Sequence, residues 1–192
     1  MSIRPNFTGI DLGKFKKSFG SKDKKIADEL FENYEKSLVV VDGKRHYEVG
    51  QEEDRMMIEE AVLGGPEKAV EMENNYPYLM SRLAETQPER VTTESDGWTS
   101  YFLEYLENLL EKLEGPGKKM IEYLWQGRKL FSEGKTGTEY PYSYLTKEEI
   151  AILLKDMEEK WSTYNDFEFA PDFKGWLEEF RDKGKDLFLT EG

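Results

Sequence analysis

The chain has 192 residues, of which 38% are hydrophobic and 14% aromatic, so it is long and apolar enough to build a real core. It contains no cysteine and one histidine, which excludes disulfides, thiolate metal sites and clusters of histidine ligands. Its net charge of −13 argues against nucleic-acid binding, which needs a basic surface. The first residues lack the apolar run of a signal peptide, and no stretch approaches the roughly 20 apolar residues of a membrane span, so we expect a cytoplasmic protein.

The excess acid is concentrated in the middle of the chain. Residues 1–50 carry a net charge of +2, residues 51–114 carry −11, and residues 115–192 carry −4. A concentrated negative charge attracts basic partners and speeds their association. The charge distribution therefore directs attention to the helices predicted in the middle third.

The first 50 residues predict a short strand, two helices and a hairpin. The stretch "NFTGI" predicts a strand, and Asp11 and Ser21 are candidate N-caps of the two helices that follow. The run "LVVVDGKRHYEVG" predicts a hairpin that turns at Asp42 and Gly43. A lone hairpin is marginally stable in water, so we expect it to pack on helices or to join the first strand.

The rest of the chain predicts helices with clear start and stop signals. Proline or acid opens several of them, glycine pairs or Gly-Pro-Gly end others, and Thr146 with Glu149 predicts a capping box. The predicted helices cover residues 51–63, 66–75, 77–85, 98–114, 118–134, 146–161 and 172–189. We interpret the intervening segments 86–97, 135–144 and 165–171 as loops.

These elements predict a mainly α fold, with α+β as the alternative. We expect a compact multi-helix domain with at most a small sheet or hairpin near the N-terminus. Residues 1–192 would form a single domain, with a small N-terminal subregion at 1–50 and a helical body at 51–192. The spacing of apolar residues predicts these core side chains: Leu30, Tyr34, Phe102, Leu106, Leu109, Leu124, Trp125, Ile150, Leu154, Trp161 and Trp176.

The sequence offers few residues for catalysis. The one histidine, His46, lies in the predicted hairpin, and a strand residue without a chemical role is the simpler interpretation. The sequence shows no pattern for a phosphate loop, a nucleophile elbow or a calcium loop. We therefore expect no cofactor, no metal ion and no catalytic residue of these classes. A pair of carboxylates in an aromatic cleft stays open, because 40 Asp and Glu residues provide many such pairs by chance.

Two predicted helices carry acid that a basic partner could contact. In "YFLEYLENLLEKLEG", four glutamates follow helical spacing and form one stripe opposite the leucines. The acidic start of the helix at 51–63 provides a second set, and the two sets would form one patch if the helices pack side by side. Solubility alone is the alternative explanation. The predicted contacts are first Glu104, Glu107, Glu111 and Glu114, and second Glu52, Glu53 and Glu60.

Two aromatic segments, "TEYPYSYL" and "YNDFEFAPDF", are a second candidate surface. Tyr and Phe are favoured in the centres of protein interfaces, where they bury much area at little cost in entropy. The alternative is that these rings cover the helical core from outside. The residues are Tyr140, Tyr142, Tyr144, Tyr164, Phe167, Phe169 and Phe173.

Two stretches resemble a family of uncharacterised bacterial domains. One is "IDLGKFKKSFGSKD", and the other is "WQGRKLFSEG" followed by "YSYLTKEEI". The resemblance implies a compact bacterial cytoplasmic domain of unknown function. It implies no functional residue.

The sequence thus supports two functional hypotheses. The first is a non-enzymatic, acidic protein-binding module, such as an immunity protein, an antitoxin or an inhibitor, that acts on a basic protein partner and binds neither nucleic acid nor membrane. Its motivation is the acid of residues 51–114 together with the shortage of catalytic residue types. The second is a carboxylate-dependent hydrolase of the glycosidase type, which would need two close acids in a cleft.

Overall fold

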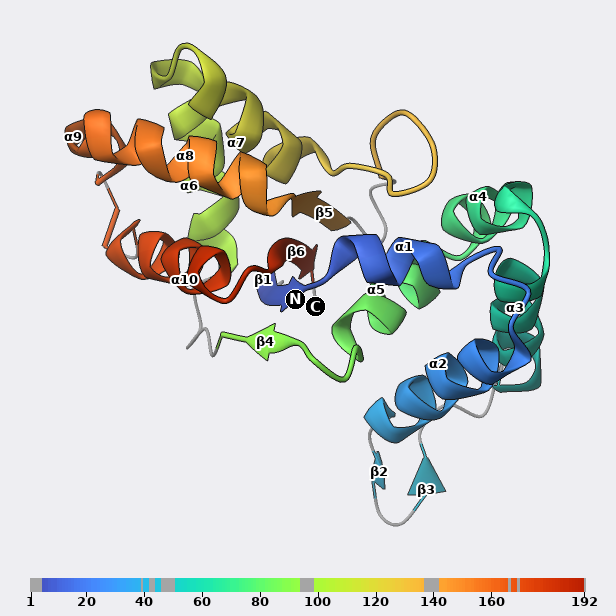
Figure 1. Cartoon of the computed structure of the whole chain (residues 1–192). Helices are drawn as coiled ribbons and strands as arrows, with labels where there is room; N and C mark the ends of the chain where they lie inside the picture. The colour runs from blue at the N-terminus through green and yellow to red at the C-terminus, as the bar shows by residue number, and fades with distance from the viewer. Residues whose placement is uncertain are drawn as a thin grey trace. The chain divides into compact units, whose positions relative to one another are not determined.

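The computed structural model describes residues 5–38, 40–41, 44–45, 51–93, 99–136, 142–165, 167–168 and 170–191. The described residues fold into two compact units (Figure 1). The sheet unit comprises Met1–Leu12, Val91–Lys129 and Gly134–Gly192. The helical unit comprises Gly13–Arg90 and the short segment Leu130–Glu133. Each unit is described by itself below.

A four-stranded antiparallel sheet organises the sheet unit, in the order β4-β1-β6-β5. Its strands are β1 (Pro5–Ile10), β4 (Val91–Thr92), β5 (Tyr142–Leu145) and β6 (Asp186–Glu191). The two central strands, β1 and β6, come from opposite ends of the chain, and Pro5 pairs with Glu191 while Ile10 pairs with Asp186. Side chains of both strands are buried on the two faces of the sheet, and all four residues of β5 are buried as well.

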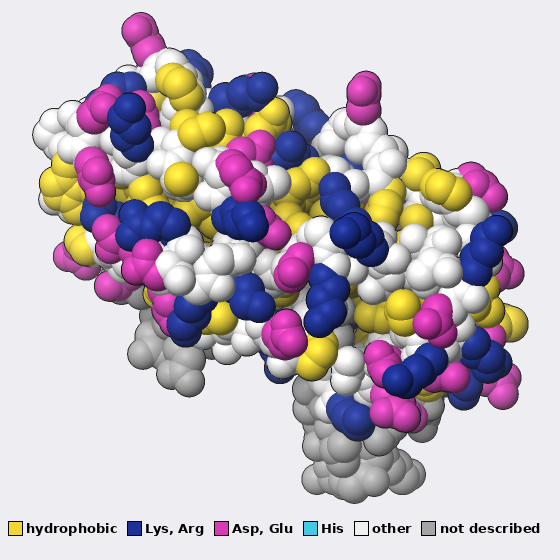
Figure 2. Space-filling model, in the orientation of Figure 1, with side chains coloured by type: hydrophobic (Ala, Val, Ile, Leu, Met, Phe, Trp, Pro, Cys, Tyr) yellow, Lys and Arg dark blue, Asp and Glu magenta, His cyan; other side chains and the backbone are white. Residues whose placement is uncertain are grey.

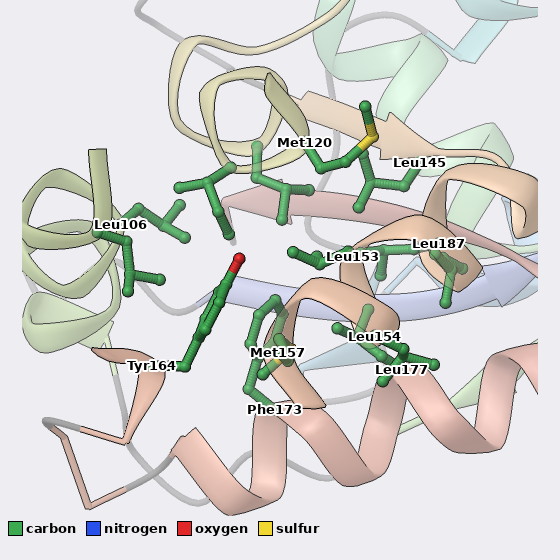
Figure 3. Close-up of a cluster of buried hydrophobic side chains, with 14 of the residues drawn as sticks. Leu106, Met120, Leu145, Leu153, Leu154, Met157, Tyr164, Phe173, Leu177 and Leu187 are labelled. Atoms are coloured by element: carbon green, nitrogen blue, oxygen red, sulfur yellow. The ribbon is translucent and has the colours of Figure 1, made fainter. Parts of the chain in front are cut away.

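Five helices belong to the sheet unit: α6 (Thr99–Lys112), α7 (Pro116–Gln126), α8 (Lys147–Glu159), α9 (Trp161–Tyr164) and α10 (Ala170–Asp182). Helices α6, α7, α8 and α10 pack through the leucines and aromatic rings of one cluster, to which the strands add Phe7, Leu145 and Leu187. Figure 3 shows these side chains converging from α6, α7, α8, α9, α10, β5 and β6. The capping box predicted at Thr146 and Glu149 is confirmed at the start of α8.

The sheet and two helix starts meet at Asp186, the first residue of β6. One carboxylate oxygen accepts from the backbone N–H of Leu12, and the other accepts from that of Lys147, both at 2.8 Å. These are the first residues of α1 (Leu12–Ser18) and α8, so one side chain satisfies a free N–H at two helix starts. Burial raises the pKa of the Asp186 carboxyl, although both hydrogen bonds act in the opposite direction.

The helical unit contains α1 (Leu12–Ser18, except its first residue), α2 (Lys24–Ser37), α3 (Gln51–Leu63), α4 (Pro66–Asn75) and α5 (Pro77–Glu85). Helix α2 packs on α3, and α3 packs on α4. Strands β2 (Val40–Val41) and β3 (Lys44–Arg45) pair as the predicted hairpin; its turn residues Asp42 and Gly43, and His46, lie outside the described residues. The helices predicted at 51–63, 66–75 and 77–85 are confirmed.

The mainly α fold with a small sheet is confirmed, but three strands lie where the sequence predicted other structure. Strand β5 lies in the predicted loop at 135–144, and β4 lies in the predicted linker. The predicted C-terminal helix ends at Asp182, and β6 follows it. The prediction of one domain with subregions 1–50 and 51–192 stays a prediction; both sides of residue 50 belong to the helical unit.

The predicted core is confirmed apart from three tryptophans. The prediction for Trp125 was wrong, because this residue is 41% exposed. Trp161 and Trp176 are only partly buried and pack against the core. In the part of the chain that the structure describes, no helix combines the length and apolar character needed to cross a membrane. Among these same residues, no group of three or more Asp, Glu, His or Cys side chains is placed to hold a metal ion.

Candidate partner-binding site

The acidic helix α3 presents two different faces. Its inner face is buried through Asp54, Ile58, Ala61 and Val62, which recur at the three- and four-residue spacing of a helix. Because the helix turns by about 100° per residue, positions 52–53, 56, 59–60 and 63 form a row on the opposite face. The row alternates acidic and apolar residues, and we call it the α3 outer face.

The α3 outer face exposes large apolar side chains. Met56 is 54% exposed and Leu63 is 36% exposed, two helical turns apart. Apolar residues at this spacing on a helix normally face the core, but here the core side is already occupied. Exposed apolar residues bordered by charge are typical of interaction surfaces, and methionine adapts easily to the shape of a partner.

An open groove of about 540 Å³ lies along this face. We call it the α3 groove; it is lined by Met56, Glu59, Glu60, Leu63, Gly64 and Lys68, all in the helical unit. Figure 2 shows apolar, acidic and basic side chains interspersed over the region of α3 and α4. The groove therefore combines an apolar floor with a charged border inside one compact unit.

The acids of α3 differ in how they are neutralised. Glu52 and Glu53 are exposed and form no ion pair with any described residue. Acid in the first turn is favoured by the helix dipole, which explains why they stand there without a cation. By contrast, Glu59 contacts Arg55 at 3.2 Å, and Glu60 contacts Lys68 at 3.5 Å.

Lys68 bridges two carboxylates at the edge of the α3 groove. Its Nζ lies 2.9 Å from Glu71 and 3.5 Å from Glu60. The hydrogen bond to Glu71 and the negative charges of Glu71 and Glu60 raise the pKa of the Lys68 ammonium above its ordinary value. The stem of Lys68 lies against Gly64, where a Cβ atom would come within 2.7 Å of the lysine Cγ. Glycine at this position therefore makes room for the lysine stem.

The first-choice acidic residues of the sequence prediction lie in the sheet unit. Glu104, Glu107 and Glu111 are exposed on α6, and Glu114 is exposed two residues beyond its end. None of their carboxylates forms an ion pair with a described residue. They form the predicted charged stripe along α6 and just beyond its end. That the α3 and α6 acids form one patch stays a prediction, because the helices belong to different units.

Among the residues that the structure describes, three carboxylates are buried, and protein donors contact each of them. Asp54 accepts from the hydroxyl groups of Tyr34 and Tyr78, both at 2.7 Å. Asp156 accepts from the Tyr164 hydroxyl at 2.7 Å and from Lys160 at 2.8 Å. The three tyrosine contacts join different helices, and the Lys160 contact lies within the end of α8. They give the hydrolase hypothesis no observation in its favour.

The third buried carboxylate, Glu73, holds a separate piece of chain. It accepts from the backbone N–H groups of Leu130, Phe131 and Ser132, and from the Ser132 hydroxyl at 3.0 Å. Successive N–H groups turned toward one anion form a nest. Because the nest is already filled by Glu73, the segment 130–133 is bound to the helical unit.

The second candidate surface, made of aromatic residues, was mostly wrong. Tyr142 and Tyr144 are buried strand residues, and Tyr164 and Phe173 are buried in the helical core of the sheet unit. Phe167 is partly buried and packs edge-on against the Tyr105 ring at 5.3 Å. These rings are structural, which was the alternative considered for them. Tyr140 and Phe169 lie outside the described residues.

Comparisons with known proteins give no relative from which a function could be transferred. No family model matches this chain, and no curated protein or solved structure does so either. The resemblance to an uncharacterised bacterial domain family therefore stays a prediction. Any function must therefore be inferred from the geometry of the chain itself.

Sequence reasoning identified the acid of α3 but missed its apolar neighbours. Met56 and Leu63 were assigned no role, and Lys68 was not considered. The signal was present: once Ile58, Ala61 and Val62 are placed on the inner face, Met56 and Leu63 fall on the opposite side. Reading both faces of the helix would have found the groove residues on α3.

Proposed function

We propose that this chain is a non-enzymatic, acidic protein-binding module that holds a basic segment of a protein partner at the α3 groove. Immunity proteins, antitoxins and inhibitors are examples of such protein-binding modules. The observation that carries the proposal is the exposure of Met56 and Leu63 on an acid-rich helix, beside an open groove. The partner segment would place an apolar side chain on the groove floor and cationic side chains on its acidic border.

Charge and apolar area would contribute differently to such a complex. The carboxylates of Glu52 and Glu53, which pair with no described residue, would steer the partner and raise its association rate. Burial of Met56 and Leu63 would slow dissociation, since contact with apolar anchors determines most of the residence time. We rank the α6 glutamates second, because the α3 acids lie beside exposed Met56 and Leu63 and an open groove.

The test begins with capture of partners at low and high salt, followed by direct binding measurements with the purified partner. Glu52→Lys combined with Glu53→Lys should lower the association rate about tenfold or more at low salt. Met56→Ser should mainly raise the dissociation rate. The matched control reverses Glu104 and Glu107 on α6, which should have the smaller effect.

Two results would contradict the assignment. If reversal on α6 removes binding and reversal on α3 does not, the partner binds the α6 stripe and the groove is irrelevant. If neither reversal changes binding, the acidic residues contribute only to the solubility of the protein. Circular dichroism and thermal melting should confirm that each variant is folded, because the substituted side chains are all exposed.

A further inference from the structure

The α3 groove already contains a cation supplied by the chain itself. The ammonium group of Lys68 lies between Glu60 and Glu71, which belong to two successive helices. Its side chain lines the groove together with Met56 and Leu63. A partner that brings a cation to this border therefore meets an occupied position.

We propose that Lys68 occupies, in the free protein, the position that an arginine of the partner takes between Glu60 and Glu71 in the complex. This inference rests on the function proposed above. Lys68 would leave the two carboxylates and turn into solvent when the arginine arrives. The partner's arginine would be flanked by an apolar side chain that contacts Met56 or Leu63.

Lys68 is placed for exchange rather than for permanent structure. Its side chain is 40% exposed, and those of Glu60 and Glu71 are 56% and 55% exposed. Exposed ion pairs contribute little to stability, so their loss leaves the fold intact. Gly64 leaves the space in which the lysine stem rests against the backbone.

The geometry favours arginine over lysine in the partner. A lysine that replaces Lys68 would repeat the same contacts and gain little. A guanidinium group presents five N–H donors in a flat fork, and it can donate to two carboxylates at once. The exchange therefore favours an arginine of the partner over a lysine.

The experiment uses a fluorescent, alanine-based helical peptide that carries two arginines about two helical turns apart, with leucines between them on the same face. Lys68→Gln should bind this peptide about three to ten times more tightly than the unchanged protein, because the competing cation is gone. Lys68→Arg keeps a competing charge and should bind no more tightly than the unchanged protein. For a peptide with lysine in place of arginine, Lys68→Gln should increase the affinity by a smaller factor.

The matched control is Lys36→Gln, which removes one positive charge from the same unit. Lys36 is exposed, forms an ion pair with Glu32 at 3.3 Å, and does not line the groove. It should change the affinity less than about twofold, since exposed charges act weakly over a distance in salt. If Lys36→Gln and Lys68→Gln have equal effects, the exchange is wrong and only net charge matters.

A second readout follows Lys68 directly by NMR of its ε-methylene group. Saturation with the arginine peptide should shift this signal toward that of a free lysine, and an unchanged signal would overturn the exchange. If the peptide binds and Glu52→Lys weakens it, but Lys68→Gln has no effect, the groove still binds basic segments and only the exchange fails. If the unchanged protein does not bind the peptide, the exchange is also overturned, while the proposed function is judged on its own partner.

Discussion

Each unit buries an aspartate against tyrosine, but the two units balance its charge differently. In the helical unit, Asp54 accepts from two tyrosine hydroxyls, and no described basic side chain pairs with it. In the sheet unit, Asp156 accepts from one hydroxyl and from the ammonium group of Lys160. The Asp54 carboxyl group accepts from two neutral donors, whereas Asp156 belongs to a partly buried ion pair.

The difference shows which of the two sites needs its negative charge. A tyrosine hydroxyl can donate or accept, so it can adapt to a neutral amide in place of a carboxylate. A lysine ammonium can only donate, and it loses its charged partner when the carboxylate becomes an amide. The charge at Asp54 is therefore replaceable, whereas the charge at Asp156 is required.

Glu73 extends the comparison to a carboxylate held by backbone groups, and it should give the largest effect. A backbone N–H cannot reverse its direction, so the amide nitrogen of Glu73→Gln would face donors at Phe131 or Ser132. We expect a loss of about 3–5 kcal/mol in the free energy of unfolding, because buried donors remain unpaired. Urea denaturation measures this loss.

The control for Glu73 is Glu67→Gln, in an exposed position of the same helix. It should change stability by less than about 0.5 kcal/mol. A small effect at Glu73 would mean that water can replace its carboxylate, and that the segment 130–133 does not depend on it.

Gly117 tests how closely Asp156 and Tyr164 are packed. A Cβ atom at this position would meet the Asp156 carboxylate and lie 2.5 Å from the Tyr164 hydroxyl. Gly117→Ala should therefore cost about 2–4 kcal/mol, because it forces apart the buried hydrogen bond between Tyr164 and Asp156. Gly175→Ala is the matched control: it lies in a helix with open space around it, and should gain up to about 1 kcal/mol. Equal thermal shifts for both variants would contradict this packing.

The two aspartates can then be compared directly by the same substitution. Asp156→Asn should cost about 1–2 kcal/mol, because it leaves the partly exposed Lys160 without its charged partner. Asp54→Asn should cost less than about 1 kcal/mol, since its two tyrosines can reorient around the amide. Thermal melts of both variants in one buffer decide the order. The opposite order would show that the charge at Asp54 matters more than its hydrogen bonds.

Alkaline pH should reveal the smallest effect. Burial and the hydrogen bond to a carboxylate raise the pKa of Tyr78 and of Tyr164 above the ordinary tyrosine value. Because the folded-state pKa lies above the unfolded one, the tyrosine stabilises the fold below about pH 10. This stabilisation is lost as the pH rises further. At pH 10, the loss from fully buried Tyr164 is about 0.4 kcal/mol. Tyr164→Phe should remove this part of the pH dependence, and denaturation at pH 8 and at pH 10 would show whether it does.

The helices could be predicted because their signals are local. Pro66, Pro77 and the Gly64-Gly65 pair fix the ends of α3, α4 and α5 from neighbouring residues alone. Strand β4 was missed because it pairs with β1, more than eighty residues away in the sequence. Strand β6 was missed because its short apolar run fits a strand or a helix end equally well. Only the sheet itself distinguishes these alternatives.

The candidate site could be predicted in part for a similar reason. The acid of α3 is visible in the sequence, but its burial is not: Asp54 stands between exposed glutamates and yet points inward to Tyr34 and Tyr78. Trp125 shows the reverse case, since a large ring on an amphipathic helix was predicted to be buried and is exposed. The fold decides which face of a helix packs against a neighbour, and this cannot be derived from the composition of the helix.

The central position of β6 has a consequence for synthesis of the chain. Strand β6 lies between β1 and β5 and follows every other described element in sequence. During translation, β1 must wait until residues 186–191 emerge before its longest pairing can form, while residues 13–90 have already left the ribosome. The apolar side chains of β1 would stay exposed for that interval, which makes the nascent chain a candidate client for chaperones.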